Sequence, residues 1–288
     1  MTDFGFHSTA EEVTEGRDLS GSTWLITGVS SGLGRESARV LALRGAHIVG
    51  LARTRAKAAG ALEELGIDGT PVACELSDLD SVRAAVAALA AVSFDGLMAN
   101  AGIMALQTLH QTAGIEQQLF TNHVGHFALI TGLLDQLKHG GRVVVLSSEA
   151  HRMAKRGVEL DNVSGDENYH AWRMYGRSKL ANILFARSLA RRFASDGSGR
   201  TANAVHPGVI RTGLSRHVPD QEGLFKRMLK IMKTVEQGAA TQCYVATHPA
   251  LQAVSGTYFS DCAPLEPIAP ALDDAAGDAL WDWTASVT

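Results

Sequence analysis

The sequence has few cysteines, few aromatic residues and no long hydrophobic run. Its three cysteines, Cys74, Cys243 and Cys262, lie far apart and form no Cys-x2-Cys pair. This excludes a disulfide framework and a zinc ribbon, and it indicates a reducing, cytoplasmic location. Aromatic residues make up 6% of the chain, too few for a platform that stacks single-stranded nucleic acid. No apolar run approaches the ~18 residues needed to cross a bilayer.

The charge balance and the ends of the chain exclude further classes. The net charge of −4 gives no basic surface, so neither nucleic acid nor a membrane is expected as a partner. With 45% hydrophobic and 19% charged residues, the 288-residue chain is neither disordered nor a coiled coil. Residues 1–22 form a polar N-terminal extension without the character of a signal or transit peptide. No linker divides residues 23–288, which are expected to form one domain.

Short apolar runs alternate with longer alanine-rich helical patterns. The predicted strands are Thr23–Thr27, His47–Leu51, Pro71–Cys74, Gly96–Ala99, Arg142–Ser147, Thr201–Val205 and Gly256–Phe259. The predicted helices are 33–44, 54–65, 78–91, 114–138, 170–195 and 235–247. Continuous apolar strands are typical of a sheet that helices cover on both faces. The order therefore predicts a Rossmann-type α/β fold, a doubly wound parallel sheet of about seven strands whose carboxyl edge binds the ligand.

A glycine-rich turn follows the first predicted strand and opens directly into a helix. Gly28 allows a tight turn, Gly32 lets the backbone approach a pyrophosphate, and Gly34 permits close packing of helix on strand. The N–H groups and the dipole of the helix N-terminus favour a phosphate. The turn therefore predicts a dinucleotide site, whose residues here are Gly28, Ser30, Ser31, Gly32, Leu33 and Gly34.

The end of the second strand indicates which dinucleotide binds. A site for NAD needs an acidic side chain there to accept a hydrogen bond from the ribose 2′-hydroxyl. Ala52 occupies that position and Arg53 follows it. A guanidinium can pair bidentately with a 2′-phosphate, and Arg35 is a candidate helper. NADP(H) is therefore favoured over NAD(H), unless Arg53 and Arg55 are simply solvated surface residues.

Further motifs follow the strand ends in order, and together with the glycine turn they resemble the short-chain dehydrogenase/reductase family over nearly the whole chain. They are Asn100-Ala101-Gly102, Ser147-Ser148, Tyr175-x3-Lys179 and Pro207-Gly208-Val209-Ile210-Arg211-Thr212. The segments Asn122-His123-Val124-Gly125-His126, Ser178-Lys179-Leu180-Ala181-Asn182 and Tyr258-Phe259-x-Asp261-Cys262 look like the branch of retinol dehydrogenases and the WW-domain oxidoreductase. The likeness suggests a soluble member of bacterial type.

The resemblance implies further cofactor contacts and an assembly. It assigns Asn100, Ala101, Gly102, Pro207, Gly208, Ile210 and Thr212 to the cofactor, the last two at the carboxamide, and Glu75 and Leu76 to the adenine. The family commonly has Asp where this chain has Glu75, and the longer acid can still accept from the adenine amino group. Family members commonly assemble through the helices predicted at 114–138 and 170–195, which implies a homodimer or homotetramer.

The resemblance also implies the catalytic set Asn122, Ser148, Tyr175 and Lys179. Reduction of a carbonyl needs a hydride from the nicotinamide and a proton from the protein. Tyr175 is the implied acid, and because a phenol has a pKa of about 10, it needs help near neutral pH. Lys179 lies one helical turn along and stabilises the phenolate. Ser148 donates to the substrate oxygen, and Asn122 positions a water that reprotonates the lysine.

Three other features are weaker candidates for a functional role. His123 and His126 have the spacing of a metal pair, but no third ligand is evident, so no metal is predicted. Tyr169 is a rival acid that lacks a lysine four residues on. The charged run Glu149, His151, Arg152, Lys155 and Arg156 is interpreted as a solvated loop.

The sequence thus predicts an NADP(H)-dependent carbonyl reductase or secondary alcohol dehydrogenase. A narrow retinal- or steroid-type dehydrogenase and a non-catalytic NADP(H)-sensing scaffold are the alternatives. Residues 213–235 are expected to form a mobile lid, with Phe225 and Met228 facing bulky hydrophobic ketones or alcohols and Lys226, Arg227, Lys230 and Lys233 outside. A plain surface helix would show the same stripe. Trp172 and Met174 are expected to form the opposite wall.

Overall fold

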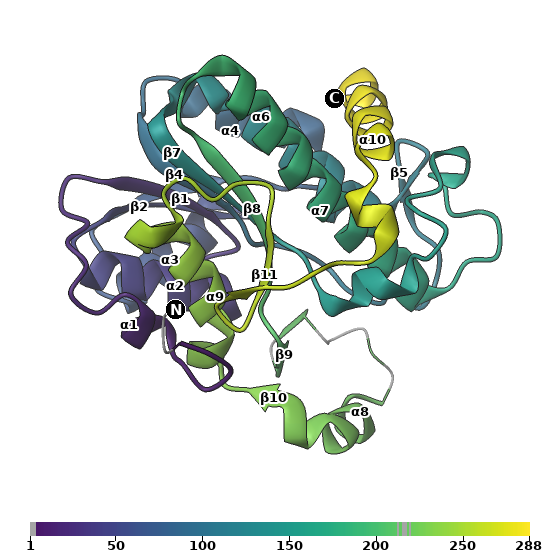
Figure 1. Ribbon diagram of the computed structural model, residues 1–288, viewed down its shortest axis with the longest axis horizontal. Helices are drawn as coiled ribbons and strands as arrows, with labels where there is room; N and C mark the ends of the chain where they lie inside the picture. The colour runs from purple at the N-terminus through teal and green to yellow at the C-terminus, as the bar shows by residue number, and fades with distance from the viewer. Residues whose placement is uncertain (1–3, 212, 215–217, 219) are drawn as a thin grey trace.

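The computed structural model describes residues 4–211, 213–214, 218 and 220–288, with the side chains of 221, 224, 225 and 227 outside the description. An eight-stranded sheet forms its centre, in the order β12-β11-β8-β7-β4-β1-β2-β3 (Figure 1). The strands are β1 (Thr23–Thr27), β2 (His47–Ala52), β3 (Thr70–Ala73), β4 (Phe94–Ala99), β7 (Leu137–Leu146), β8 (Thr201–His206), β11 (Tyr258–Ser260) and β12 (Ala263–Pro264). All neighbours pair in parallel except β11 and β12. The predicted doubly wound Rossmann-type fold is confirmed.

The eighth strand follows a turn that the apolar pattern does not reveal. Asp261 and Cys262 both take positive φ angles, of 50° and 59°, and reverse the chain so that β12 runs back along β11. The other strands agree with the prediction within a few residues, except that β7 begins at Leu137 rather than Arg142. Its register against β4 shifts between Phe94 and Gly96, which accommodates the extra length.

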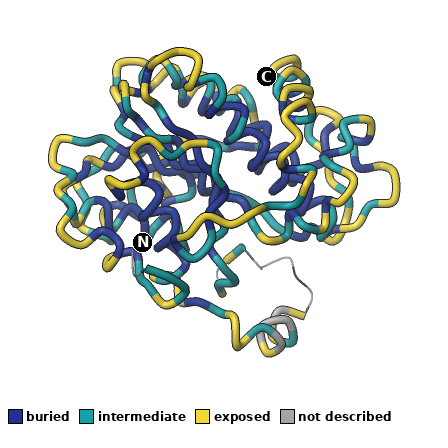
Figure 2. Tube along the Cα trace, viewed as in Figure 1, coloured by how far each residue is buried: buried dark blue, intermediate teal, exposed yellow. Residues whose placement is uncertain are grey.

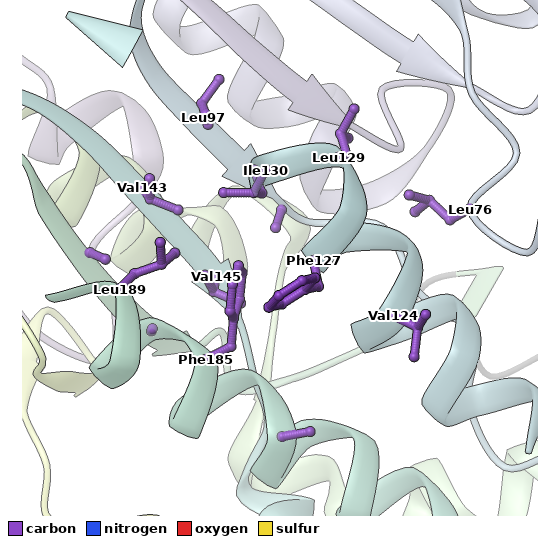
Figure 3. Close-up of a cluster of buried hydrophobic side chains, with 14 of the residues drawn as sticks. Leu76, Leu97, Val124, Phe127, Leu129, Ile130, Val143, Val145, Phe185 and Leu189 are labelled. Atoms are coloured by element: carbon purple, nitrogen blue, oxygen red, sulfur yellow. The ribbon is translucent and has the colours of Figure 1, made fainter. Parts of the chain in front are cut away.

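Helices cover both faces of the sheet. On one face lie α2 (Gly32–Leu43), α3 (Arg55–Glu64) and α9 (Val235–Thr247), and on the other lie α4 (Leu79–Ala88), α6 (Gly125–Gly132) and α7 (Ala171–Asp196). The buried residues concentrate along the strands and the inner sides of these helices (Figure 2). In the α7 layer, Phe127 and Phe185 face each other beside Val143 and Val145, with ring centroids 5.3 Å apart (Figure 3). Adjacent strand positions therefore feed two separate cores.

The long helix predicted over 114–138 is wrong at both ends. Ala113 and Gly114 take positive φ angles and turn a small hairpin, β5 (Gln111–Thr112) with β6 (Ile115–Glu116). The helical stretch then runs through α5 (Gln117–Leu119), the π-helix η1 (Phe120–Val124) and α6, before the 3-10 turn η2 (Leu134–Gln136). The apolar stripe continues past both ends because Ile115 of the hairpin and Leu133 and Leu137 on either side of η2 are buried.

The C-terminal helix α10 (Asp274–Val287) was not predicted and packs along α7. Trp281 lies against Phe127 and Phe185, and the Arg192 guanidinium carbon lies 3.7 Å from the centroid of its ring. Arg191 pairs with Asp274 at 2.6 Å. Part of the surface of α6 and α7, the helices through which assembly was expected, is therefore covered by the chain itself.

The smaller elements lie around this framework. They are α1 (Ala10–Val13), η3 (Glu149–Met153), η4 (Leu160–Asn162), β9 (Val209–Ile210), α8 (Gln221–Met228), η6 (Leu229–Ile231), β10 (Met232–Lys233), η7 (Pro249–Leu251) and η8 (Ala269–Leu272). The N-terminal extension is not a free tail from residue 4 on, because Ala10 and Val13 are buried against α9 and α2. Across the part of the chain that the structure describes, no helix is both long and apolar enough to cross a membrane.

The predicted lid contains α8, η6 and β10, and α8 projects from the body of the molecule (Figure 1). Leu229 and Ile231 are 66% and 52% exposed, so this end of the apolar stripe faces solvent. The expectation for Lys233 is wrong: its side chain is 1% exposed and pairs with Asp261. The Phe6 ring centroid lies 4.9 Å from its Nζ.

Candidate active site

A cavity of about 320 Å³ opens at the carboxyl edge of the sheet, between β1, β2, β3 and β4. Most of the predicted nucleotide contacts line it, namely Gly28, Ser30, Ser31, Gly32, Leu33, Arg53, Glu75, Leu76, Asn100, Ala101 and Gly102. The structure therefore gathers residues from four loops around one space. This is the edge at which ligands of open parallel sheets bind.

The glycine turn leaves no room for side chains. Gly28 has a φ angle of +76°, and a Cβ on Gly34 would lie 2.5 Å from both the Asn100 Nδ2 and the Gly28 carbonyl oxygen. Asn100 in turn donates from Nδ2 to the Thr27 carbonyl at 2.9 Å. Gly34 thus lets the start of α2 lie directly on the strand ends beside the cavity.

The N-terminus of α2 has no side-chain cap. The N-cap residue Ser31 makes no capping hydrogen bond, and the first turn contains no acidic residue. The first N–H groups of the helix therefore donate no capping hydrogen bond to the Ser31 side chain, and no acidic side chain of the first turn offsets the positive end of the helix dipole. A phosphate group fits this donor set.

The two arginines considered for the 2′-phosphate differ in their surroundings. Arg53 is exposed and lines the cavity. Arg35 is not part of the lining, and its Nη1 pairs with Glu64 at 2.6 Å. The structure brings only Arg53 to the site, while Arg35 is engaged on α3.

Glu75 is folded back on its own loop. Its Oε1 accepts from the Ser77 amide at 3.1 Å and from the Ser77 hydroxyl at 2.7 Å, and its amide donates to the Ser81 hydroxyl at 2.9 Å. A Cβ on Gly125 would lie 2.1 Å from the Leu76 carbonyl oxygen, so α6 packs directly on this loop. The position of the loop is therefore set from both sides.

Tyr175 and Lys179 are 4% and 2% exposed and lie one turn apart on α7. The Lys179 Nζ lies 5.7 Å from the centroid of the Tyr175 ring and donates to the Leu146 carbonyl at 2.9 Å. Burial lowers the pKa of Lys179 to about 7. Burial raises the pKa of Tyr175 to about 12, and hydrogen bonding to the Ser148 side chain acts against that rise.

The two serines after β7 point to different partners. The Ser147 hydroxyl is buried and donates to the Lys179 carbonyl at 2.7 Å. Ser148 caps η3, where its Oγ accepts from the Ala150 amide at 3.2 Å, and it is the serine that interacts with Tyr175. The geometry thus brings Ser148 rather than Ser147 to the phenol.

Asn122 lies in the π-helix η1 and connects α7 to the cavity. Its Nδ2 donates to the Ile103 carbonyl and to the Ser178 hydroxyl, both at 2.9 Å, and its Oδ1 accepts from the Ile103 amide at 2.8 Å. A Cβ on Gly102 would lie 2.9 Å from that Oδ1 and 3.6 Å from the Lys179 Nζ. Gly102 therefore forms the junction between the nucleotide cavity and Lys179.

His123 and His126 act in packing. His126 makes a 2.9 Å hydrogen bond to the Thr27 hydroxyl, and that hydroxyl accepts from the amides of Asn100 and Ala101 at 2.9 Å. His123 bonds the Thr284 hydroxyl at 3.0 Å. Burial lowers the pKa of His126 to about 4 and the pKa of His123 to about 3. In the ranges described, no three metal-ligating side chains come together.

Tyr169 is engaged elsewhere, because its hydroxyl donates to the Leu106 carbonyl at 2.7 Å. The Trp172 ring lies 6.2 Å from the Tyr175 ring, at an interplanar angle of 81°. Met174 is buried, with its sulfur 3.1 Å from the Arg177 Nη1. Of the two residues expected on the lid, Met228 is half-buried and the Phe225 side chain lies outside the description.

The segment after β8 turns at Gly208, which has a φ angle of +97°. A Cβ there would lie 2.8 Å from the Lys233 side chain, so the buried lysine packs under the Pro207-Gly208 turn. Ile210 is half-buried, and Thr212 lies outside the described residues. Sequence reasoning missed the contact of Lys233 because its partner, Asp261, is 28 residues away.

The solvated loop expected over 149–156 is wrong for His151. This residue is fully buried in η3, and its Nδ1 lies 2.7 Å from the Ser148 carbonyl oxygen. Arg152 and Glu149 do pair at the surface. The burial of His151 could not be predicted, because the local sequence does not show which residue of the charged run lies beneath the turn.

Comparison with known proteins gives consistent matches. A family model described as short chain dehydrogenase matches residues 22–223. The chain is 41% identical to the short-chain dehydrogenase TIC 32 B, chloroplastic, of Brassica napus, over 98% of this chain and 93% of that protein. It is 37% identical to retinol dehydrogenase 14 of Mus musculus (92% and 85%) and 34% identical to the WW domain-containing oxidoreductase of Gallus gallus (96% and 70%).

Two solved structures share the fold. An uncharacterised protein from Mycobacterium Paratuberculosis has a TM-score of 0.79 at 31% identity, with 96% of each chain covered. A short chain dehydrogenase from Burkholderia cenocepacia, in complex with NADP, has a TM-score of 0.68 at 25% identity, covering 84% of this chain and 96% of that one. The predicted family and its branch are thereby confirmed.

Proposed function

The chain belongs to the short-chain dehydrogenase family, and from this premise we propose that it is an NADP(H)-dependent carbonyl reductase or secondary alcohol dehydrogenase. The observation that carries the proposal is the junction at Gly102. A Cβ on Gly102, which lines the cavity with the glycine turn, would lie 3.6 Å from the buried Lys179 Nζ, and that Nζ lies 5.7 Å from the Tyr175 ring centroid. Cofactor binding and proton transfer could then act on one substrate.

The residues around the cavity fit a nicotinamide dinucleotide. The uncapped N-terminus of α2 offers N–H groups to the pyrophosphate, and Gly34 lets the start of this helix lie directly on the strand ends. Bound there, the cofactor would supply the hydride. Exposed Arg53 at the lining supports NADP(H), since its guanidinium can pair with a 2′-phosphate. The NADP-bound relative of known structure is consistent with this choice.

The buried groups supply the proton. In the reducing direction, Tyr175 gives its phenolic proton to the carbonyl oxygen while Ser148 donates a hydrogen bond to the same oxygen. Burial alone makes the phenolate costly, as the raised pKa of Tyr175 shows. The Lys179 ammonium, 5.7 Å from the ring, offsets that cost when it is protonated. Asn122 holds the loop at Ile103 and is proposed to order the water that returns a proton to Lys179.

We propose bulky hydrophobic ketones or alcohols as the substrates, between Trp172 on one side and the segment 213–235 on the other. The edge-to-face contact of Trp172 with Tyr175 supports the first wall. The relatives named retinol dehydrogenase favour a narrower apolar substrate of that type as the second candidate. A cytoplasmic location and assembly as a homo-oligomer remain predictions.

The experiment is to follow NADPH absorbance while the purified protein is offered a panel of aryl and alkyl ketones. Loss of absorbance that requires both protein and ketone supports the reductase, and a preference for NADPH over NADH supports the cofactor assignment. Ser148→Ala is compared with Ser147→Ala as its matched control. Of these two serines, only Ser148 interacts with Tyr175. If the protein binds NADPH but consumes none with any ketone, the scaffold alternative is correct.

A further inference from the structure

Ser148 is held by the short helix that it begins. η3 (Glu149–Met153) starts directly after it, and the Ser148 Oγ accepts from the Ala150 amide at 3.2 Å. The Glu149 amide donates to the His206 Nδ1 at 3.2 Å, at the end of β8. The orientation of Ser148 therefore depends on where η3 sits on the sheet.

His151 fixes η3 from below. It is fully buried, and its Nε2 accepts from the Ile268 amide at 3.3 Å. This nitrogen must be the bare one of the ring, so Nδ1 carries the hydrogen and donates to the Ser148 carbonyl oxygen at 2.7 Å. Burial lowers the pKa of His151, which favours this neutral, single-donor form. One ring thus links the catalytic serine to the segment before η8 (Ala269–Leu272).

The ring itself is fixed by the sheet. It packs edge-to-face on Tyr258 of β11, with centroids 5.1 Å apart and an interplanar angle of 69°. Tyr258 is 2% exposed and pairs in register with Ala204 of β8. His151 therefore cannot shift without moving a buried aromatic side chain, which makes it a rigid support for the backbone of Ser148.

The other side of η3 rests on the catalytic helix. A Cβ on Gly176 would lie 2.5 Å from the Ala150 carbonyl oxygen, so α7 and η3 touch at the residue that follows Tyr175. Ser148 and Tyr175 thus sit on two elements pressed against each other. A displacement of η3 would change the position of the Ser148 hydroxyl relative to the phenol.

We propose that His151 is a positioning residue for Ser148: its imidazole clamps the Ser148 carbonyl and so aims the hydroxyl at the substrate oxygen beside Tyr175. This rests on the proposed function, in which Ser148 is catalytic. His151 is fully buried and is not part of the cavity lining, so its proposed effect passes through Ser148. Because misplacement of a catalytic group by about 1 Å can cost 10²-fold in rate, losing the clamp should slow turnover without weakening cofactor binding.

The test uses His151→Phe and His151→Asn in the NADPH-dependent reduction of a ketone. The amide of residue 151 also donates to the Ser148 carbonyl, at 3.0 Å, and every variant keeps that bond. Phenylalanine keeps the ring packing on Tyr258 but has no side-chain donor for the carbonyl, whereas the Asn amide can donate from near the place of Nδ1. His151→Phe is expected to lower kcat between about tenfold and about a hundredfold, with NADPH affinity unchanged. His151→Asn should recover most of the loss. Wild-type kcat in a folded His151→Phe would overturn the proposal.

A double mutant separates positioning from general destabilisation. If His151 acts through Ser148, then Ser148→Ala combined with His151→Phe is no slower than Ser148→Ala alone. If the double mutant instead loses the product of the two single effects, His151 does not act through that hydroxyl and the proposal is wrong.

Arg152→Ala is the matched control. Arg152 is the next residue on η3 and likewise holds the C-terminal segment, through the Glu266 carbonyl at 3.1 Å, while its Nε pairs with Glu149 rather than Ser148. Its loss should leave kcat near the wild-type value. If Arg152→Ala reproduces the His151→Phe defect, anchoring of the C-terminal segment is the cause and the proposal fails.

A third substitution of His151 covers a failure to fold. If His151→Phe does not bind NADPH, the comparison moves to His151→Gln, whose amide lies near Nε2 and can bond Ile268 but not Ser148. A higher kcat for Asn than for Gln supports the clamp, and an equal or lower one overturns it. Wild-type turnover in Ser148→Ala would instead refute the proposed catalytic set, so the two failures are distinguishable.

Discussion

The two halves of the carboxyl edge are built differently. On the side of β1, β2 and β3, the edge is open: the α2 N-terminus has no cap, and Arg53 is exposed at the lining of a cavity of about 320 Å³. On the side of β7 and α7 the edge is closed. Ser147, Tyr175 and Lys179 are each less than 5% exposed.

In the proposed function, the open half binds the cofactor and the closed half transfers the proton. The open half leaves donors and charge for a ligand that brings its own phosphates. The closed half is already hydrogen-bonded, so its groups need no reorganisation when charge develops on a substrate oxygen. Variants in the open half should therefore change cofactor affinity, and variants in the closed half should change turnover.

In the closed half, the largest loss of turnover is expected when Tyr175 is replaced. Tyr175→Phe removes the transferred proton and leaves the cavity lining intact, so we expect turnover to fall by about 10²-fold or more at unchanged NADPH affinity. Steady-state rates and NADPH titration of the same sample measure both. Tyr169→Phe is the matched control, because its hydroxyl is bonded to the Leu106 carbonyl. Comparable turnover in the two variants would contradict the assignment.

The open half is tested at Arg53. Arg53→Ala should raise the KM for NADPH between about tenfold and about a hundredfold and leave that for NADH nearly unchanged, because only the 2′-phosphate loses a charged partner. Arg55→Ala, two residues on and not at the lining, should change neither. Equal effects of Arg53→Ala on the two cofactors would show that Arg53 does not contact that phosphate.

Lys179 gives the closed half a pH signature. Burial lowers its pKa from 10.5 to about 7, so between these values the unfolded chain binds one proton more than the folded one. The contribution of Lys179 to the free energy of unfolding therefore rises with pH across this window, by up to about 1.4 kcal/mol per pH unit, and is lost as the pH falls towards 7. Lys179→Met should abolish that rise in denaturant unfolding curves. Parallel pH profiles for the two proteins would show that burial does not lower the pKa of Lys179 in the folded protein.

The smallest effect is expected at the predicted lid, residues 213–235, of which Leu214 lines the cavity. Replacing Phe225 and Met228 with Ala should change the ratio of kcat/KM between bulky and small ketones by about tenfold, with NADPH affinity unchanged. If the ratio stays constant and only the melting temperature falls, the segment is a plain surface helix. The exposure of Leu229 and Ile231 leaves that alternative open to the experiment.

The sequence predicts best those features that short stretches of chain determine. The α9 helix has the predicted bounds because Thr234 and Gln237 form a local capping box. The glycine turn and the Tyr175–Lys179 spacing likewise depend on neighbours in the chain. Eleven of the predicted cofactor residues line the cavity because the carboxyl ends of neighbouring parallel strands meet at one edge, while their roles remain predictions.

Features that depend on distant partners could not be predicted. His151 is buried because Ile268, 117 residues on, bonds its ring, and Lys233 is buried because Asp261 pairs with it. The same holds for α10, whose packing needs Phe127 and Phe185 from two other elements. A charged run or an amphipathic stripe has the same sequence pattern whether or not such distant partners exist.

The most direct test of the account follows the hydride itself. The protein is incubated with a ketone and NADPH that carries deuterium on the transferable position at C4 of the nicotinamide, and the product alcohol is analysed by mass spectrometry. If the open and closed halves act on one substrate, deuterium appears on the carbinol carbon of the product, and Tyr175→Phe abolishes its appearance. An alcohol without deuterium, or no alcohol while NADPH binds normally, would contradict the account.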